Sequence, residues 1–293
     1  MRDSSIKSDR IKVYYRLTKP GIIYGNMIAA IAGFLLASKN GFNVWLFIAT
    51  MAGIALVIAA GCVFNNYTDI YIDGKMTRTK KRALVTGEIK PRSALIFGIV
   101  LAIIGFSILA LWTNWLTVLV GVVGIVDYVA LYAVAKRKTV HGTLVGTISG
   151  AAPPVAGYVA VTNQFDTGAM LLFAVMVVWQ MAHFYAIAMF RASDYKAAHI
   201  PVLPLKQGMK TTKINIVLYI CAFIVASLLL PLFGYAGYSY SVVVVVLGLV
   251  WLYVAVGGFR STADILWART VFKFSLYVLL GFSVMVALGN VLP

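Results

Sequence analysis

The sequence predicts an all-α membrane protein whose chain crosses the bilayer about nine times and folds into one bundle. Apolar residues make up 61% of its 293 residues, and the mean hydropathy of +0.91 lies well above that of soluble proteins. Apolar runs of about 20 residues, the length of a helix that crosses a bilayer, recur along the chain. We therefore expect residues 1–293 to form a single transmembrane domain.

The expected spans are the apolar runs, and polar residues on either side set their ends. They cover residues 20–38, 43–64, 93–113, 115–135, 142–162, 167–190, 214–233, 240–258 and 271–292. Pro20 suits the first turn of the first span, where a backbone N–H would have no helical partner in any case. Residues 1–19 mix apolar and basic positions, so we expect a cytoplasmic segment that lies on the membrane surface.

The distribution of positive charge gives the expected orientation. Of the 25 Lys and Arg residues, 24 lie in five segments, which are residues 1–19, 65–92, 136–138, 191–213 and 260–273. With nine spans all five lie on one side, and the positive-inside rule places the N-terminus in the cytoplasm and the C-terminus outside. The net charge of +16 then reflects topology and anionic membrane lipid, with no nucleic acid as a partner. We expect a multi-pass protein of the bacterial cytoplasmic (inner) membrane.

The Asp-rich cytoplasmic loop, residues 65–92, carries Asn65, Asp69 and Asp73 at intervals of four residues. If the preceding helix continues into the loop, these side chains share one face. Two carboxylates placed together suit magnesium, which is usually held by one or two carboxylates and by substrate phosphates. A run of cations at residues 75–82 is suited to the remaining phosphate oxygens. The alternative is a solvated loop in which acids and bases only pair with each other.

Two polar residues lie inside the predicted spans. Asp127 lies in the fourth span, where an ionisable side chain is costly and is therefore a candidate functional residue. It is either neutral because it is desolvated, or paired with a group on a neighbouring helix. Asn26 lies in the first span and serves either an interhelical hydrogen bond or the functional site.

Pro153 and Pro154 lie within the fifth predicted span. Proline has no backbone N–H, and its ring clashes with the preceding turn, so the sequence predicts an interrupted helix at this point. Irregular backbone at membrane depth is tolerated only where it faces protein or a watery cavity. We therefore expect a pocket near these prolines.

The sixth span leads into the second polar loop, residues 191–213. Gln180 and His183 are three residues apart on one helical face at membrane depth, so both should point into the bundle. His183 is either a hydrogen-bonded core residue or a ligand or acid–base group. The sequence contains no Cys/His cluster with zinc spacing, no Ser/His/Asp nucleophile signature and no phosphate-binding glycine motif.

Several of these motifs resemble those of a known family. Asn65-x-x-x-Asp69-x-x-x-Asp73 resembles the Asn/Asp-rich motif of the UbiA-type intramembrane prenyltransferases. Further runs resemble the haem-farnesylating branch of that superfamily, namely Asp73-x-x-Met76-x-Arg78-Thr79-x-x-Arg82, Lys136-Arg137-x-Thr139, Gly150-Ala-Ala-Pro153-Pro154, and Trp179-Gln180-Met181-x-His183-Phe184 followed by Asp194-Tyr195. Ala198 stands where many superfamily members have a second Asp, and Ala182 stands where the branch usually has Pro.

The resemblance implies transfer of the farnesyl group of farnesyl diphosphate to a vinyl group of haem B, with hydration, which gives haem O and diphosphate. Mg²⁺ is the implied cofactor, and haem B is implied as a substrate rather than a permanent cofactor. The active site is implied on the cytoplasmic side. Membrane lipid, and a terminal oxidase or a haem-pathway membrane protein, are the further implied partners.

The resemblance also implies roles for individual residues. The expected catalytic residues are Asn65, Asp69, Asp73 and Asp194, and the expected metal ligands are Asp69 and Asp73. The expected diphosphate-binding residues are Arg78, Lys81, Arg82, Lys136 and Arg137. The expected haem or acceptor pocket contains Tyr132, Gln180, His183 and Tyr185. Candidates for shielding an allylic cation by cation–π contact are Tyr128, Tyr132, Trp179 and Tyr185.

Two other functions stay open from the sequence. Prenylation of an aromatic acid or quinone precursor would use the same diphosphate site with a different acceptor pocket, and a prenylated benzoate product would identify it. A transporter or a structural membrane subunit would explain the spans without chemistry, and the protein would then release no diphosphate.

Overall fold

The computed structural model describes residues 2–289, and the side chains within that range except those of residues 2–9 and 40. These residues form helices joined by short connections, and no strand occurs among them. Within the same range, nine helical segments are long and apolar enough to cross a membrane. The predicted fold class and number of spans are confirmed, and the chain is a multi-pass membrane protein.

The nine spans are formed by α2 (Pro20–Ala37), α3 (Val44–Thr68), α5 (Pro91–Trp112), α6 (Trp115–Val126) continued by η2 (Asp127–Leu131) and α7 (Tyr132–Lys138), α8 (Gly142–Thr162), α9 (Thr167–Phe190), α12 (Gly208–Leu232), α13 (Tyr238–Val256) continued by η3 (Gly257–Arg260), and α14 (Asp264–Leu288). The shorter elements are α1 (Arg2–Leu17), η1 (Ser38–Asn40), α4 (Ile70–Lys75), α10 (Ala192–Ala197) and α11 (Leu203–Lys206). The η2 segment is a π-helix within the fourth span.

The starts of the last spans differ from the prediction. Helix α12 begins at Gly208 rather than at residue 214, and α14 begins at Asp264 rather than at residue 271. Hydropathy detects only the apolar part of a helix, whereas the first turns here contain charged residues that pair with each other. Lys213 of α12 donates a hydrogen bond of 2.5 Å to Asp264 of α14. The end of the last predicted span, residues 290–292, lies outside the described residues.

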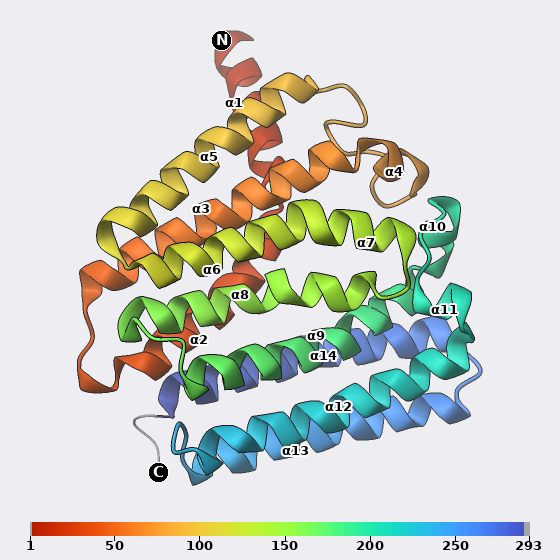
Figure 1. The fold of residues 1–293 in the computed structure, drawn as a ribbon. Coiled ribbons are helices and arrows are strands. Elements are labelled where there is room, and N and C mark those ends of the chain that lie inside the picture. Colours follow the sequence, from red (N-terminus) through yellow and green to blue (C-terminus); the bar gives the residue numbers. More distant parts are fainter. Residues whose placement is uncertain (1, 290–293) are drawn as a thin grey trace.

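Four helices form the centre of the bundle. Helices α2 and α8 pack together, α8 packs on α9, α9 on α14, and α14 returns to α2, so that the four enclose a common space. Helices α3, α5 and α6 lie on one side of this group, and α12 and α13 lie on the other (Figure 1). The short helices α4, α10 and α11 lie together at one end of the bundle (Figure 1). That end contains the two polar loops.

Side-chain caps begin three helices at the opposite end of the bundle. The side chain of Asn43 accepts a hydrogen bond from the backbone N–H of Leu46 at the start of α3. Asn114 does the same for α6, and Asp166 for α9. Each cap satisfies one backbone donor that has no partner within its helix.

Helix α8 runs unbroken through Pro153 and Pro154, so the predicted interruption is wrong. The fixed φ angle of proline is compatible with a helix, so each proline costs a hydrogen bond and a steric clash with the preceding turn but does not have to end the helix. Close packing against α2 holds the segment in place. A Cβ atom on Gly33 of α2 would lie 2.0 Å from the carbonyl oxygen of Pro154, and one on Gly157 would lie 2.2 Å from that of Ala30. The neighbouring helix thus supports the backbone that the prolines weaken.

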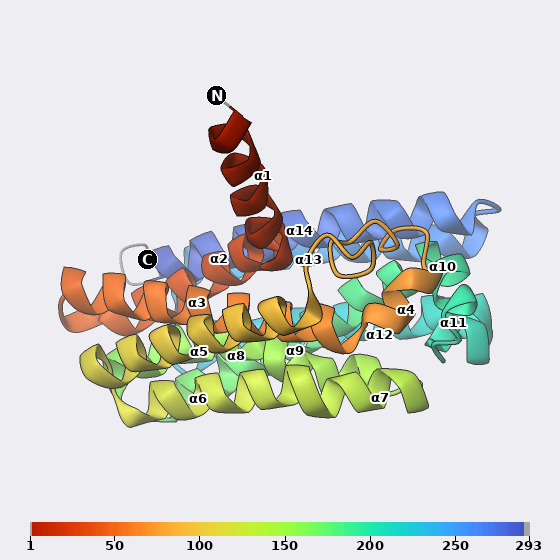
Figure 2. The same ribbon diagram turned by 90° about the horizontal axis from the view of Figure 1, so that it is seen from above.

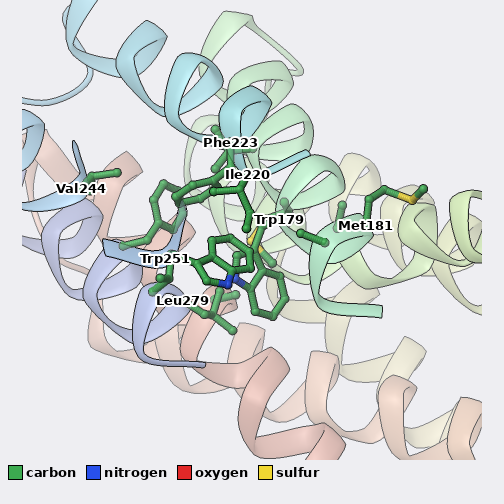
Figure 3. Close-up of a cluster of buried hydrophobic side chains, with 14 of the residues drawn as sticks. Trp179, Met181, Ile220, Phe223, Val244, Trp251 and Leu279 are labelled. Carbon is green, nitrogen blue, oxygen red and sulfur yellow. The ribbon is translucent and has the colours of Figure 1, made fainter. Parts of the chain in front are cut away.

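A large apolar core joins α9 to the C-terminal helices. Figure 3 shows Trp179 of α9 packed among Ile220 and Phe223 of α12, Trp251 of α13 and Leu279 of α14. Trp251 is fully buried, whereas Trp179 and Leu279 are also part of a cavity wall. This core therefore fixes one side of the functional site.

Helix α1 extends away from the bundle (Figure 2). Its C-terminal end is packed: Val13 and Leu17 are buried in a small cluster with Leu84 and Ile89, and the ring of Tyr14 lies 5.0 Å from that of Phe97. The segment before Pro20 is helical, and its predicted position on the cytoplasmic membrane surface stays a prediction.

Candidate active site

A large cavity with a volume of about 760 Å³ lies inside the bundle. Residues from several helices line it, for example Gly25 of α2, Asn65 of α3, Tyr128 of η2, Gly150 of α8, His183 of α9 and Leu279 of α14. Gly150 and Pro153 belong to its wall, which confirms a pocket near the two prolines. Arg78 lines the cavity and is exposed, so the cavity reaches the surface at the end that carries α4.

Asn65, Asp69 and Asp73 all line this cavity and all are buried. Helix α3 continues to Thr68, Asp69 forms the junction, and α4 carries Asp73. The helical hydrogen bonding continues across the junction, because Asp69 N–H donates to Asn65 O at 3.0 Å and Asp73 N–H donates to Asp69 O at 2.7 Å. The prediction that the three residues share one face is therefore confirmed.

The carboxylate of Asp69 is the centre of a charged network. Lys136 of α7 forms an ion pair and hydrogen bond with Oδ2, and Arg137 donates to Oδ1 at 3.0 Å. Asn65 Nδ2 also donates to Oδ2, at 3.0 Å. Burial favours a raised pKa for Asp69, but Lys136 and Arg137 outweigh this effect and hold the pKa below its usual value. Asp69 is thus a carboxylate at neutral pH.

Asp73 has its own cation. Arg82 donates a hydrogen bond of 2.5 Å to Asp73 Oδ2, and the exposed fraction of the Asp73 side chain is only 3%. The hydroxyl of Thr79 donates to the backbone carbonyl of Asp73 at 2.9 Å, so the chain after α4 folds back over the Asp. Acids and bases of this loop do pair with each other, but they do so in the cavity wall rather than in a solvated loop.

Lys19 is a cavity residue that the sequence did not reveal. It lies directly before α2 and donates a hydrogen bond of 2.6 Å to Asn65 Oδ1. Burial, with a smaller contribution from the charge of Arg82, lowers the pKa of the Lys19 ammonium to about 8. Its only signal in the sequence is its position next to Pro20, and nothing local links it to a residue 46 positions away.

The remaining predicted diphosphate-binding residues fall into two groups. Arg78 lines the cavity at its mouth, and Arg137 contacts both Asp69 and the carbonyl of Thr68. Lys81 is exposed and is not part of the cavity wall. Helix α4 and its loop thus direct Arg78 and Arg82 inward and leave Lys81 on the surface.

Besides Lys81 and Arg137, two further predicted site residues do not line the cavity. Asp194 is buried and accepts a hydrogen bond of 2.9 Å from the backbone N–H of Thr77, so it anchors the loop after α4 to α10. Tyr185 is buried in the apolar core, where its ring lies 5.9 Å from that of Tyr219. Arg191, which the sequence did not single out, does line the cavity, and its guanidinium lies 4.0 Å from Asp194.

Aromatic rings line the middle of the cavity. Tyr128 and Tyr132 are stacked with ring centroids 5.9 Å apart, and the ammonium of Lys136 lies 5.0 Å from the Tyr132 centroid. Gln180 also lines the cavity, and its amide donates to the carbonyl of Met176 at 3.0 Å. The cavity wall thus contains stacked aromatic rings next to the cation Lys136.

The apolar part of the cavity surrounds His183. Its ring stacks on Trp179 at 4.8 Å, and its Nδ1 lies 2.6 Å from the hydroxyl oxygen of Ser275. Phe272 and Leu279 of α14 complete this wall. Ser275 and Phe272 could not be identified from the sequence, because they lie about 90 positions away on a helix whose neighbours cannot be read from local pattern.

The two polar residues left open by the sequence now have partners. Asp127 Oδ2 accepts a hydrogen bond of 3.0 Å from the backbone N–H of Ser149 in α8, so its partner is a group on a neighbouring helix. Its other oxygen is buried and has no hydrogen-bond partner among the described residues. Asn26 donates to Ile22 within its own helix at 2.8 Å and also lines the cavity.

The oxygen atoms at the charged end suit a magnesium ion that takes part of its ligands from a substrate. Mg²⁺ keeps water and substrate oxygens in its shell and takes one or two carboxylates from a protein. Among the residues that the structure describes, no group of three His, Cys, Asp or Glu side chains lies close enough to hold a metal ion alone. Asp69 and Asp73, with the amide of Asn65, therefore suit a shared site completed by phosphate oxygens, not a closed protein site.

The chain is similar to known proteins over nearly its whole length. The sequence model of the UbiA prenyltransferase family matches residues 26–277. A protoheme IX farnesyltransferase of Yersinia pseudotuberculosis is 52% identical over 278 residues, which cover 94% of this chain and 94% of that protein. A protoheme IX farnesyltransferase of Cronobacter sakazakii is 51% identical over 284 residues, which cover 97% of this chain and 96% of that protein.

Solved structures share the fold. The structure of a digeranylgeranylglyceryl phosphate synthase matches with a TM-score of 0.78 at 20% identity, covering 97% of this chain and 99% of that one. A UbiA homologue from Archaeoglobus fulgidus bound to GPP and Mg²⁺ matches with a TM-score of 0.73 at 15% identity, covering 93% and 99%. The family match, the two relatives and the shared fold lead to one conclusion: the chain belongs to the UbiA prenyltransferase family and is a membrane prenyltransferase.

Proposed function

We propose that this prenyltransferase transfers the farnesyl group of farnesyl diphosphate to a vinyl group of haem B, with addition of water, to give haem O and diphosphate. The observation that carries the proposal is that one cavity is lined both by charged residues, Asp69, Asp73 and Arg82, and by apolar residues such as Trp179 and Leu279. A prenyl diphosphate has the same division into an anionic head and an apolar tail. The names of the relatives that are about half identical support haem as the acceptor.

The charged end is suited to the leaving group. When the allylic C–O bond breaks, it leaves an anionic diphosphate and an allylic cation, so the transition state is stabilised by charges placed around the diphosphate. Arg78, Arg82 and Lys136 line the cavity there and are the proposed ligands of the diphosphate oxygens. Asp69 and Asp73, oriented by Asn65, would hold Mg²⁺, and the ion would neutralise negative charge on the leaving group.

The reaction requires no nucleophile from the protein. The π electrons of the vinyl group form the new C–C bond to the first carbon of the farnesyl chain, and the C–O bond to diphosphate breaks. Positive charge then develops on the vinyl carbon next to the porphyrin ring. Water adds to that carbon, forms the hydroxyl and loses one proton to solvent. The side chains act by holding two substrates together and by keeping bulk water from the allylic cation.

The stacked rings of Tyr128 and Tyr132 lie where that cation would need protection, between the charged and the apolar ends. A ring face stabilises a desolvated cation by about 2 kcal/mol or more. Tyr185, buried in the core, is not part of this proposal. Trp179 is proposed to shield the cation from the apolar end of the cavity, where its ring also stacks on that of His183.

The location of the site follows from the charge distribution. Lys136 and Arg137 lie in the last turn of α7, Arg78 follows α4 and Arg191 precedes α10. These elements meet at the end of the bundle that carries the two polar loops (Figure 1), and the positive-inside rule places that end in the cytoplasm. We therefore propose a site that opens toward the cytoplasmic side of a bacterial inner membrane. A terminal oxidase or haem-pathway membrane protein as the recipient of the product stays a prediction.

The proposal is tested with the purified full chain in detergent, farnesyl diphosphate and Mg²⁺, and either haem B or a hydroxybenzoate as acceptor. Products are identified by mass, and released diphosphate is quantified. We expect a hydroxyethylfarnesyl haem together with diphosphate, and neither product with EDTA. A prenylated benzoate without any haem product would assign the aromatic acceptor instead. No diphosphate release with either acceptor would contradict the proposed chemistry.

A further inference from the structure

His183 is held rigidly in the apolar wall of the cavity. Its ring stacks on Trp179 with centroids 4.8 Å apart and planes 24° from parallel. The ring of Phe272 lies 4.9 Å away on α14, and that of Phe184 lies 5.3 Å away. Three aromatic contacts leave the imidazole little rotational freedom, so the direction of each ring nitrogen is set by packing.

The hydrogen bonds of Ser275 determine which nitrogen of His183 carries the proton. The hydroxyl of Ser275 lies 2.6 Å from the backbone carbonyl of Phe272, which can only accept, so Ser275 donates its one hydrogen there. The same oxygen lies 2.6 Å from His183 Nδ1 and must therefore accept a hydrogen from it. In the neutral imidazole the proton is then on Nδ1, and Nε2 carries a lone pair.

That lone pair faces the cavity. His183 is one of the lining residues, and within residues 2–289 its Nε2 has no hydrogen-bond partner. Nε2 is also not among the enclosed polar atoms that lack a partner in the described part of the chain, so it is accessible from the cavity. A neutral imidazole whose Nδ1–H is fixed by an oxygen and whose Nε2 is free is the usual arrangement of a metal-ligating histidine.

We propose that Nε2 of His183 binds the iron of the acceptor haem as an axial ligand, and that Ser275 is the positioning residue that holds the imidazole in the required tautomer. The proposal rests on haem as the acceptor, and it adds a site for the iron to that function. Apolar side chains that suit the faces of a porphyrin line the same cavity, among them Met176, Leu276 and Leu279. The other two histidines, His141 and His199, are exposed and do not line this cavity.

Ligation at this place has a consequence for the transfer. An iron–imidazole bond fixes the centre of the porphyrin against α9, while the ring can still turn about that bond until one vinyl group faces the charged end. The iron keeps its oxidation state, and the bond between the iron and His183 breaks when the product leaves. Ligation therefore acts by positioning one substrate, and it leaves the bond making to the vinyl and allylic carbons.

The experiment uses the purified full chain with ferric haem B, without farnesyl diphosphate, and records absorption and electron paramagnetic resonance spectra. We expect spectra of a histidine-ligated haem in the wild type, in His141→Ala and in His199→Ala. The spectra should lose the histidine signature in His183→Ala and regain it when free imidazole is added. A histidine signature that persists in His183→Ala, or a wild-type spectrum of oxygen ligation such as by Tyr128, overturns the proposal.

Ser275 supplies a second test in case His183→Ala does not fold. In Ser275→Ala the Nδ1–H loses its acceptor, and removal of such an outer partner costs roughly 10- to 100-fold in affinity. We expect the haem Kd to rise by that factor, while Ser275→Thr keeps the hydroxyl and stays near the wild-type value. Equal Kd values for all three overturn the role of Ser275.

The same samples separate this inference from the proposed function. Each is given farnesyl diphosphate, Mg²⁺ and a hydroxybenzoate, and the haem and benzoate products are measured by mass. A wild type that farnesylates haem but shows no histidine ligation overturns the iron site and leaves the function standing. A wild type that binds haem through His183 but yields only a prenylated aromatic acid overturns haem as the acceptor, and with it the proposal for the iron.

Discussion

Lys136 of α7 forms an ion pair with Asp69 at the end of α3, although the two residues are 67 positions apart in the sequence. The pair connects the fourth span to the second at the end of the cavity where the diphosphate is proposed to bind. Both side chains are nearly enclosed, with exposed fractions of 11% and 8%. A diphosphate and its metal ion would take over both partners, so the pair holds the charged end together before the substrate arrives.

Replacing Asp69 by Asn should abolish most of the activity. The amide keeps the size of the side chain but removes the negative charge that is proposed to bind the metal and that balances Lys136 and Arg137. Loss of one such electrostatic group costs about 100-fold or more in kcat. Diphosphate release under saturating substrates is the measurement. Glu88→Gln, the same change at an exposed acid of the same loop, is the control and should leave the rate unchanged.

Arg82 tests the diphosphate site, and its neighbour Lys81 provides the matched control. Arg82 lines the cavity and contacts Asp73 at 2.5 Å, whereas Lys81 is exposed. A hydrogen bond to a charged group contributes about 1.5–3 kcal/mol, so Arg82→Gln should lower kcat/KM for farnesyl diphosphate by roughly 10- to 100-fold. Lys81→Gln should change it less than twofold. An equal loss in both variants would show that the cations act only through the general field of the loop.

The activity should fall at alkaline pH because Lys19 loses its proton. With a pKa of about 8, its ammonium is charged below that pH and loses its proton as the pH rises through it. The loss removes one positive charge beside Asn65, so kcat/KM for farnesyl diphosphate should decline above about pH 8. Arginine stays protonated at these pH values, so Lys19→Arg should move the decline to higher pH. An unchanged pH profile in this variant would assign the decline to another group.

The close approach of α2 and α8 should be sensitive to a single methyl group. A Cβ on Gly33 would lie 2.0 Å from the backbone oxygen of Pro154, so Gly33→Ala must push the two helices apart. Overpacking of this kind costs about 1–3 kcal/mol. The melting temperature in detergent should therefore drop. Gly257→Ala, at a glycine with no neighbouring atom within 4 Å, should melt like the wild type, and equal melting of both variants would contradict the packing argument.

Local features of the fold were predictable from the sequence. The spans follow from hydrophobic length, and the common face of Asn65, Asp69 and Asp73 follows from their fourfold spacing, because both depend only on residues close together in the chain. The interruption of α8 at its prolines was predicted wrongly for a related reason. The rule against proline within a helix assumes that nothing outside that helix supports it, whereas α2 packs directly against Pro154.

The site was only partly predictable, because its contacts depend on which helices become neighbours. The contacts of Lys19 with Asn65 and of His183 with Ser275 span 46 and 92 positions, and no local pattern links them. The position of Tyr185 outside the cavity, in contrast, was predictable from helix geometry. At 3.6 residues per turn it lies about 200° around the helix from His183, which places it away from the cavity.

A prenyl diphosphate and haem B are proposed to bind together in this cavity. An experimental structure of the full chain with Mg²⁺, haem B and farnesyl thiodiphosphate, an analogue whose leaving group departs slowly, would show whether they do. We expect diphosphate oxygens beside Asp69, Asp73 and Arg82, the iron bound to Nε2 of His183, and a vinyl group facing the first farnesyl carbon. Haem bound on the outer surface of the bundle, or diphosphate bound away from Asp69 and Asp73, would contradict this arrangement.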